Sequence, residues 1–165
     1  MMKKVLLVLG LFLGLLVNAW ATYFGAVEIT SINAPPLKVW EKLADFSLLD
    51  WNPEVVKVEL IEGVAMKPGA VRVVTLKDGS KYKEKLVEID PSKMRLVAEV
   101  IESTLPMKQL SSTLNVTEKY GTAIVEWNGQ FTSDNPQDAQ KASQFIQALY
   151  RKGFAHLKTM LEAKP

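Results

Sequence analysis

The sequence lacks cysteine and contains a single histidine, His156, in 165 residues. The absence of cysteine excludes disulfide bonds, thiolate metal ligands and a thiol nucleophile. One histidine cannot supply the paired histidines of a zinc-binding helix, and a lone histidine on a helix is more often a surface residue than a catalytic base. Phosphate-binding loops, dinucleotide-binding glycine patterns and calcium loops are also absent from the sequence. We therefore expect no metal ion, no cofactor and no catalytic nucleophile.

The chain also has almost no net charge, with 20 Lys and Arg against 18 Asp and Glu, or +2 at neutral pH. Lys3 and Lys4 form a short basic start, an apolar run follows at residues 5–17, and a small-x-small pattern closes the segment at residues 19–21. This order is typical of a secretory signal peptide, and the apolar run is short for a bilayer span. An uncleaved membrane anchor is the alternative interpretation.

The expected organisation is a signal peptide at residues 1–21 and a single domain at residues 22–165, exported to a bacterial periplasm with no transmembrane segment after cleavage. Removal of Lys3 and Lys4 with the signal leaves equal numbers of basic and acidic residues. A neutral domain gives no electrostatic reason to expect a nucleic-acid or anionic-membrane partner. The remaining chain is long enough to bury a core without disulfide bonds.

The longest predicted element is a helix over residues 135–164. Asn135 can cap its first turn, Pro136 suits the first helical position, and Asp138 complements the helix dipole. Apolar residues then recur every three or four positions and form one wide stripe: Ala142, Phe145, Ile146, Leu149, Gly153, Leu157, Met160 and Leu161. A stripe of this width needs a large apolar surface to lie on.

Apolar and polar residues alternate through most of the region between Phe24 and Phe131, which is typical of strands that are exposed on one side. The exception follows Pro35, where apolar spacing predicts a short helix and then a second short helical turn at residues 45–51. The expected strands cover residues 23–33, 55–62, 71–76, 80–90, 94–100, 110–116 and 123–131. We predict an α+β fold in the order β-α-α-β6-α, in which a curved antiparallel sheet wraps around the long C-terminal helix.

The loop at residues 77–79 sets the register of one predicted hairpin. A two-residue turn would place Arg72 opposite Lys85, which is a like-charge pair. A three-residue loop, with Gly79 in the left-handed conformation, places Arg72 opposite Glu84 instead. In this register Arg72 and Glu84 point inward as a pair, while the lysines of the second strand face water. Such a pair is either a structural ion pair or part of a ligand site, and the sequence favours neither.

The concave face of the predicted sheet carries a few polar or amphipathic side chains among apolar ones, which is the usual composition of a ligand pocket. Trp51 and Asn52 precede a proline at a predicted helix end, so we expect them at the mouth of the pocket. The alternative is a filled core between sheet and helix. The candidate ligand-binding residues are Trp51, Asn52, Arg72, Tyr82, Glu84, Ser112 and Trp127.

Several motifs resemble the helix-grip (SRPBCC) superfamily, which includes polyketide cyclases, START lipid-transfer domains and Bet v 1-like allergens. The first cluster is Asn33-Ala34-Pro35-Pro36, Val39-Trp40, Asp45-Phe46 and Trp51-Asn52-Pro53. The later motifs are Gly69, Arg72, Leu76-x-Asp78-Gly79, Glu84-x-Leu86 and Val125-Glu126-Trp127. The resemblance covers nearly all of residues 22–165, and it implies a helix-grip fold with a hydrophobic cavity.

Within this superfamily the chain is most similar to the exported accessory proteins of bacterial methanol oxidation. That resemblance implies a non-enzymatic role beside a periplasmic quinoprotein dehydrogenase and its cytochrome partner. Those proteins often have His where this chain has Asn52, so a titrating group is missing here. The favoured function is therefore a binding or accessory protein whose partner is a small apolar ligand, a periplasmic dehydrogenase or a cytochrome.

Two other functions stay open. One is a polyketide cyclase or dehydratase-like enzyme, in which Glu84 would act as a general base held by Arg72, and Tyr82 would donate to an enolate oxygen. The other is a periplasmic carrier of lipid or another small apolar ligand, with a mobile gate near Trp51 or residues 63–69.

Overall fold

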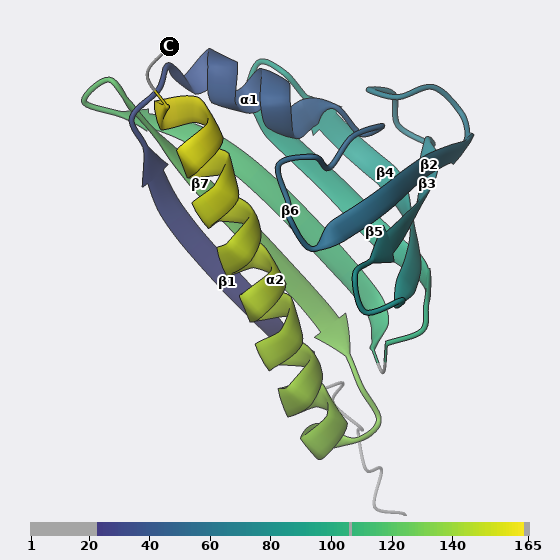
Figure 1. Cartoon of the computed structure of the whole chain (residues 1–165). Coiled ribbons are helices and arrows are strands. Elements are labelled where there is room, and N and C mark those ends of the chain that lie inside the picture. Colours follow the sequence, from purple (N-terminus) through teal and green to yellow (C-terminus); the bar gives the residue numbers. More distant parts are fainter. Residues whose placement is uncertain (1–22, 106, 164–165) are drawn as a thin grey trace, which may run out of the picture.

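The computed structural model describes residues 23–105 and 107–163, so the predicted signal peptide lies outside the described residues. Seven strands and two helices follow one another along this part of the chain (Figure 1). They are β1 (Tyr23–Ile32), α1 (Pro36–Ala44), β2 (Val55–Glu62), β3 (Val71–Leu76), β4 (Lys81–Asp90), β5 (Arg95–Ser103), β6 (Lys108–Lys119), β7 (Thr122–Thr132) and α2 (Pro136–Glu162).

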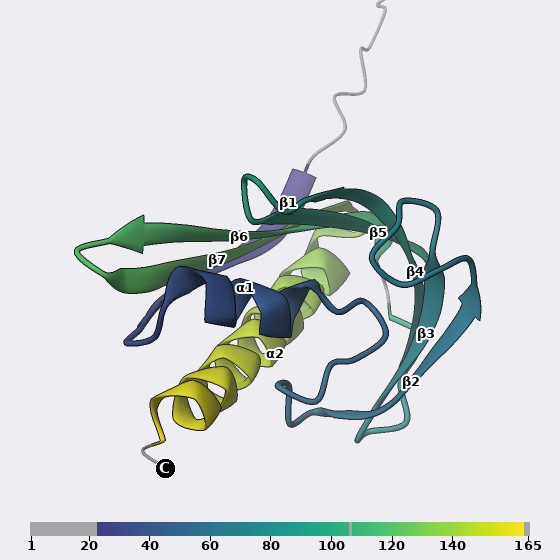
Figure 2. The ribbon, with the colours of Figure 1, turned by 90° about the horizontal axis from the view of Figure 1, so that it is seen from above.

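The strands form a single antiparallel sheet in the order β1-β7-β6-β5-β4-β3-β2, so β1 and β2 are its edges. The sheet curves strongly, and both helices lie on its concave side (Figure 2). Helix α2 runs along β1 and β7, while α1 closes one end of the trough (Figure 1). This arrangement is the helix-grip fold, and it confirms the predicted α+β class.

The residues that predicted the start of α2 have the expected roles in the structure. The Asn135 side chain accepts a hydrogen bond from the Gln137 amide at 2.9 Å, Pro136 occupies the first turn, and Asp138 lies in that turn. The helix ends at Glu162, close to the predicted boundary. The residues that it buries are Ala139, Ala142, Ile146, Leu149, Tyr150, Gly153, Phe154 and Leu157. Met160, which was expected in the apolar stripe, is exposed near the helix end.

The predicted second helical turn at residues 45–51 is wrong, because this segment forms separate turns. Helix α1 ends where Asp45 takes an extended backbone conformation. The Asp45 carboxylate then accepts hydrogen bonds from the Ser47 amide at 2.9 Å and the Ser47 hydroxyl at 2.6 Å. A short polar side chain that bonds its local backbone competes with helix formation, and here it prevails.

The predicted register of the β3–β4 hairpin is confirmed. Arg72 pairs with Glu84 across the two strands, and Val74 pairs with Tyr82. Gly79 has a φ of +86°, the left-handed conformation that the three-residue loop requires. The hairpin therefore directs Arg72 and Glu84 into the trough, where both are almost completely buried.

Candidate functional site

A small cavity lies between α2 and the concave face of β4 to β7. The space in it that a water molecule can occupy is about 30 Å³. That volume suffices for one or two waters and is far below the several hundred Å³ typical of drug-sized ligands. Its lining is apolar except for a polar end: Tyr82, Glu84, Val100, Ser103, Leu105, Met107, Leu110, Ser112, Trp127, Phe145, Ile146, Leu149 and Tyr150.

Four of the seven predicted site residues line this cavity: Tyr82, Glu84, Ser112 and Trp127. They come from β4, β6 and β7, and period-two alternation aims all of them inward. Arg72 lies behind Glu84 and does not reach the cavity wall. The sequence thus placed the polar end of the cavity correctly from strand alternation and one hairpin register.

The Arg72–Glu84 pair is a buried ion pair with further support for the arginine. Arg72 Nε and Nη2 both contact Glu84 Oε1, at 2.6 Å and 2.5 Å. Arg72 Nη1 donates to the Phe46 carbonyl at 2.9 Å, and the guanidinium lies 4.0 Å from the centre of the Phe46 ring. Each charge is therefore compensated inside the protein. No hydrogen bond reaches the other carboxylate oxygen of Glu84 from the described residues, which leaves that oxygen free to accept one.

Trp127 and Tyr150 form part of the cavity wall. Their rings stack at 3.8 Å with an interplanar angle of 15°. The Trp127 indole Nε1 donates to the Ser112 hydroxyl oxygen at 2.6 Å, so the Ser112 proton stays available to another acceptor. Gly129 makes this packing possible, because a Cβ at that position would lie 2.4 Å from the Tyr150 hydroxyl. Strand β7 therefore supplies both the stacking surface and the gap that admits the phenol.

The Tyr150 hydroxyl is buried and makes no hydrogen bond to any described residue. The Ser112 hydroxyl faces it without meeting the geometry of a hydrogen bond. Burial, as the largest effect, raises the pKa of the Tyr150 phenol well above its ordinary value of 10.0, and Ser112 opposes that shift. Burial and then the Glu84 carboxylate likewise raise the pKa of Tyr82. Both phenols therefore remain protonated at neutral pH and can donate to an oxygen in the cavity.

Trp51 and Asn52 do not lie at the mouth of the cavity, contrary to the sequence prediction. Both are buried, and neither lines the cavity. Trp51 packs edge-on against Trp127 at 5.3 Å, and its indole Nε1 has no hydrogen-bond partner among the described residues. Asn52 donates to the Leu149 carbonyl of α2 at 3.4 Å and accepts from the Glu54 amide at 3.1 Å. Asn52 therefore joins the loop before β2 to the middle of the long helix.

Sequence reasoning missed Tyr150 and Phe154 of α2. Both belong to the buried helix face, and Tyr150 lies four positions after Ile146 in the predicted stripe. That spacing could have indicated that Tyr150 points inward. Its contact with Trp127 could not be read from spacing, because it depends on how far α2 lies from β7.

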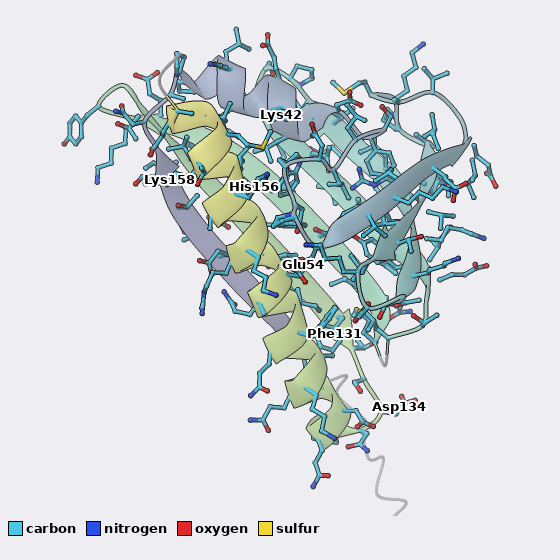
Figure 3. The ribbon with its side chains drawn as sticks, viewed as in Figure 1. Lys42, Glu54, Phe131, Asp134, His156 and Lys158 are labelled. Carbon is cyan, nitrogen blue, oxygen red and sulfur yellow. The ribbon has the colours of Figure 1, made fainter. Side chains whose placement is uncertain are left out.

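A second hollow lies outside the first, between α2 and the tip of the β3–β4 hairpin. It has a volume of about 100 Å³ and is lined by Glu54, Leu76, Lys77, Asp78, Phe145, Ala148, Leu149 and Lys152. Phe145 and Leu149 belong to both linings, so these two side chains separate the outer hollow from the buried cavity. Lys152 and Glu54, which is labelled in Figure 3, form an ion pair at 3.2 Å beside the outer hollow.

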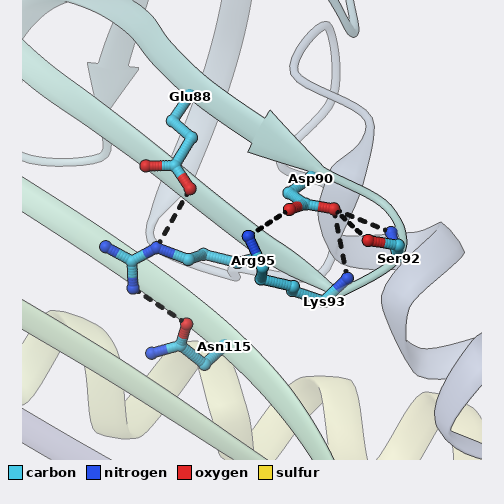
Figure 4. Close-up of polar contacts among 6 residues, drawn as sticks. All are labelled: Glu88, Asp90, Ser92, Lys93, Arg95 and Asn115. Carbon is cyan, nitrogen blue, oxygen red and sulfur yellow. Dashed lines mark hydrogen bonds and ion pairs between the residues drawn. The ribbon is translucent and has the colours of Figure 1, made fainter.

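Several other polar groups lie away from this cavity. His156 is exposed on α2, as expected for a lone helical histidine (Figure 3). A polar network surrounds the β4–β5 turn (Figure 4). There Asp90 accepts from Ser92 and Lys93, and Arg95 contacts Glu88 and Asn115. Among residues 23–105 and 107–163, no cluster of His, Asp and Glu could hold a metal ion.

Comparison with known proteins identifies the family. The profile of the family described as "Polyketide cyclase / dehydrase and lipid transport" matches residues 26–162. The chain belongs to this family. No curated protein matches the chain in sequence. No helix in the described part of the chain is both long and apolar enough to cross a membrane.

Solved structures of similar proteins agree with this membership in the polyketide cyclase, dehydrase and lipid transport family. The protein XoxI from Bacillus cereus has 25% identity and a TM-score of 0.75, over 84% of this chain and 95% of that chain. A protein from Thermobifida fusca has 26% identity and a TM-score of 0.73, over 86% and 97%. Major latex-like protein 151 from Panax ginseng shares the fold at 17% identity and a TM-score of 0.71, over 86% and 99%.

Proposed function

We propose that this protein is a ligand-binding accessory protein that holds a small, mostly apolar molecule by one oxygen atom. The observation that carries the proposal is the buried Tyr150 hydroxyl, which has no hydrogen-bond partner among the described residues and belongs to a side chain of the cavity wall. A buried polar atom without a partner is costly, and a bound water or ligand oxygen would remove that cost. Ser112 and the second oxygen of Glu84 offer further bonds at the same end.

The cavity must enlarge before an organic ligand can enter, because about 30 Å³ holds only water. Phe145 and Leu149 separate the cavity from the outer hollow, so rotation of these side chains would join the two spaces. The joined space would run between α2 and the β3–β4 hairpin. This position differs from the gate expected near Trp51, since Trp51 is buried against Trp127 and Phe154.

The finer part of the proposal concerns place and partner. We propose that the protein is exported to the periplasm and supports a quinoprotein dehydrogenase of the methanol type or its cytochrome partner. The signal-like pattern of residues 1–21, the sequence resemblance to exported accessory proteins of methanol oxidation and the structural similarity to XoxI support this part. Isolation of the protein from a periplasmic extract, followed by affinity capture of a dehydrogenase, would test it.

An enzyme of cyclase or dehydratase type is the second candidate. It is favoured by one arrangement, in which the Glu84 carboxylate and the protonated phenols of Tyr82 and Tyr150 line the same apolar cavity. A carboxylate can accept a proton while a phenol stabilises an enolate oxygen. Glu84→Gln keeps the shape of the side chain and removes the base. Turnover of a polyketide substrate that disappears in this variant would favour the enzyme over the binding protein.

The binding proposal is tested with p-cresol and toluene, two ligands of similar shape that differ by one hydroxyl. Their dissociation constants are measured by NMR titration for the wild type and for Tyr150→Phe. We expect the preference for p-cresol over toluene to fall about tenfold in the variant, the size of one hydrogen bond. Tyr120→Phe, at a residue that is 95% exposed, is the matched control and should leave the preference unchanged.

Two results would contradict the binding proposal. One is the absence of binding by either ligand, combined with native mass spectra that show no co-purified molecule. The other is a preference for p-cresol that survives in Tyr150→Phe. A reproducible extra mass in the wild type would support the proposal, and solvent extraction would identify the compound.

A further inference from the structure

The two edge strands of the sheet differ in whether side chains bond their backbone. At the β1 edge, side chains of α2 bond the free backbone carbonyls: Gln147 donates to Val27 at 2.8 Å and Lys158 donates to Ser31 at 2.8 Å. At the β2 edge, no side chain of the described residues bonds the backbone of residues 56–62. Proteins usually cover or charge such edges, because an open edge pairs readily with another strand.

The uncovered β2 edge also carries exposed apolar side chains beside its charged ones. Val56 in the strand and Val64 just after it are 58% and 59% exposed, although both are large aliphatic residues. The other exposed apolar side chains of this stretch are Leu60, Ile61 and Met66. A run of exposed aliphatic side chains along an open strand edge is typical of an interaction surface rather than of random exposure.

The charges of β2 determine which partner fits. The pairing of β2 with β3 is regular from Lys57 to Leu60 and irregular on either side. Lys57 and Glu59 lie on one face and form an ion pair at 2.9 Å. A two-fold axis through Val58 would align β2 antiparallel with β2 of a second copy. Lys57 would then lie opposite Glu59 of the other copy, and Val56, which lies in the irregular step before Lys57, would lie near Leu60 of the other copy.

We propose that β2 is a dimerisation edge, at which two copies of this chain pair antiparallel about Val58 and join their sheets into one. The occupant is a second copy because the residues on either side of Val58 are complementary to each other: Lys57 to Glu59 in charge, and Val56 to Leu60 in hydrophobicity. Opposite charges and aliphatic pairs directly across two strands are stabilising, and like charges are destabilising. The irregular pairing on either side restricts the contact to a short segment, so the dimer is weak. This proposal is independent of the cavity and its ligand.

The test uses the protein purified from a periplasmic extract and sedimentation velocity from about 10 μM to about 1 mM, the range of a weak interface. The wild type should dimerise within this range. Lys57→Glu places acidic residues opposite each other, and Glu59→Lys places lysines opposite each other. Each variant alone should show a dissociation constant raised on the order of tenfold. An equimolar mixture of the two should recover dimers, because the charges are then complementary in the heterodimer.

Two controls separate pairing from folding. Lys38→Glu makes the same change of charge on α1, which packs on β6 and β7, and should dimerise like the wild type. Thermal unfolding of each variant at low concentration should match that of the wild type. A wild type that stays monomeric to the highest concentration overturns the proposal. So does equal dimerisation of Lys57→Glu alone and of its mixture with Glu59→Lys.

Discussion

Replacement of Glu84 by leucine would leave the Arg72 guanidinium charged, buried and without its carboxylate. The two side chains are 8% and 7% exposed, so water cannot replace the lost partner. Removal of one member of a buried ion pair costs about 3–5 kcal/mol. Arg72 keeps its bond to the Phe46 carbonyl and its contact with the Phe46 ring. We therefore expect the lower end, about 3 kcal/mol.

The double variant Arg72→Met/Glu84→Leu gives the sharper result. Arg72→Met alone leaves Glu84 unpaired, so it should cost about 3 kcal/mol as well. The double variant removes both charges and replaces them with apolar side chains. The double variant buries neither charge, so the desolvation cost of the pair is absent. It should therefore be at least as stable as either single variant. The two sites are then coupled by about 3 kcal/mol or more.

Urea unfolding followed by tryptophan fluorescence measures these free energies, with equal slopes required for comparison. The matched control is the exposed pair Arg95–Glu88 shown in Figure 4, at 3.2 Å with side chains 37% and 46% exposed. Its double-variant cycle should give a coupling below about 1 kcal/mol. Additive losses at Arg72 and Glu84, with the double variant as unstable as the sum, would refute the reasoning.

Three further predictions concern other parts of the structure. Gly129→Ala should lower the free energy of unfolding in urea by about 1–3 kcal/mol, because the added Cβ meets the Tyr150 hydroxyl. Adding Tyr150→Phe, which removes that hydroxyl, should restore part of the lost free energy. A loss that Tyr150→Phe leaves unchanged would contradict this contact. Burial raises the pKa of Tyr82 and Tyr150, so the stability they give is present below pH 10 and is lost as the pH rises above it. Alkaline unfolding, followed by the absorbance of ionised tyrosine at 295 nm, should therefore begin at higher pH in Tyr150→Phe than in the wild type. An unchanged midpoint of this transition would contradict the prediction. Hydrogen bonds from Lys93 and Ser92 lower the pKa of Asp90 below 3.8, so Asp90→Asn should be less stable than the wild type at neutral pH. This small difference should vanish as the pH falls well below 3.8, and a difference that persists in strong acid would show another cause.

The sequence alone was sufficient for most of the fold. Alternation of apolar residues predicted the strands, and the spacing of the apolar stripe together with the cap at Asn135 predicted α2. The three-residue loop with Gly79 selected the register that pairs Arg72 with Glu84. These features depend on neighbours in sequence or on one hairpin, and local stereochemistry decides them. The prediction of a second helical turn was wrong because its apolar spacing gave no sign of the Asp45–Ser47 hydrogen bonds.

The sequence predicted only part of the candidate site. Strand alternation placed Tyr82, Glu84, Ser112 and Trp127 inward, and all four line the cavity. Three properties were decided by tertiary structure: the burial of Trp51 and Asn52 against α2, the stacking of Tyr150 on Trp127, and the small size of the cavity. Each depends on the distance between α2 and the sheet. That distance is set by packing among side chains far apart in the chain, such as the gap at Gly129 that admits the Tyr150 hydroxyl, and no local pattern records it.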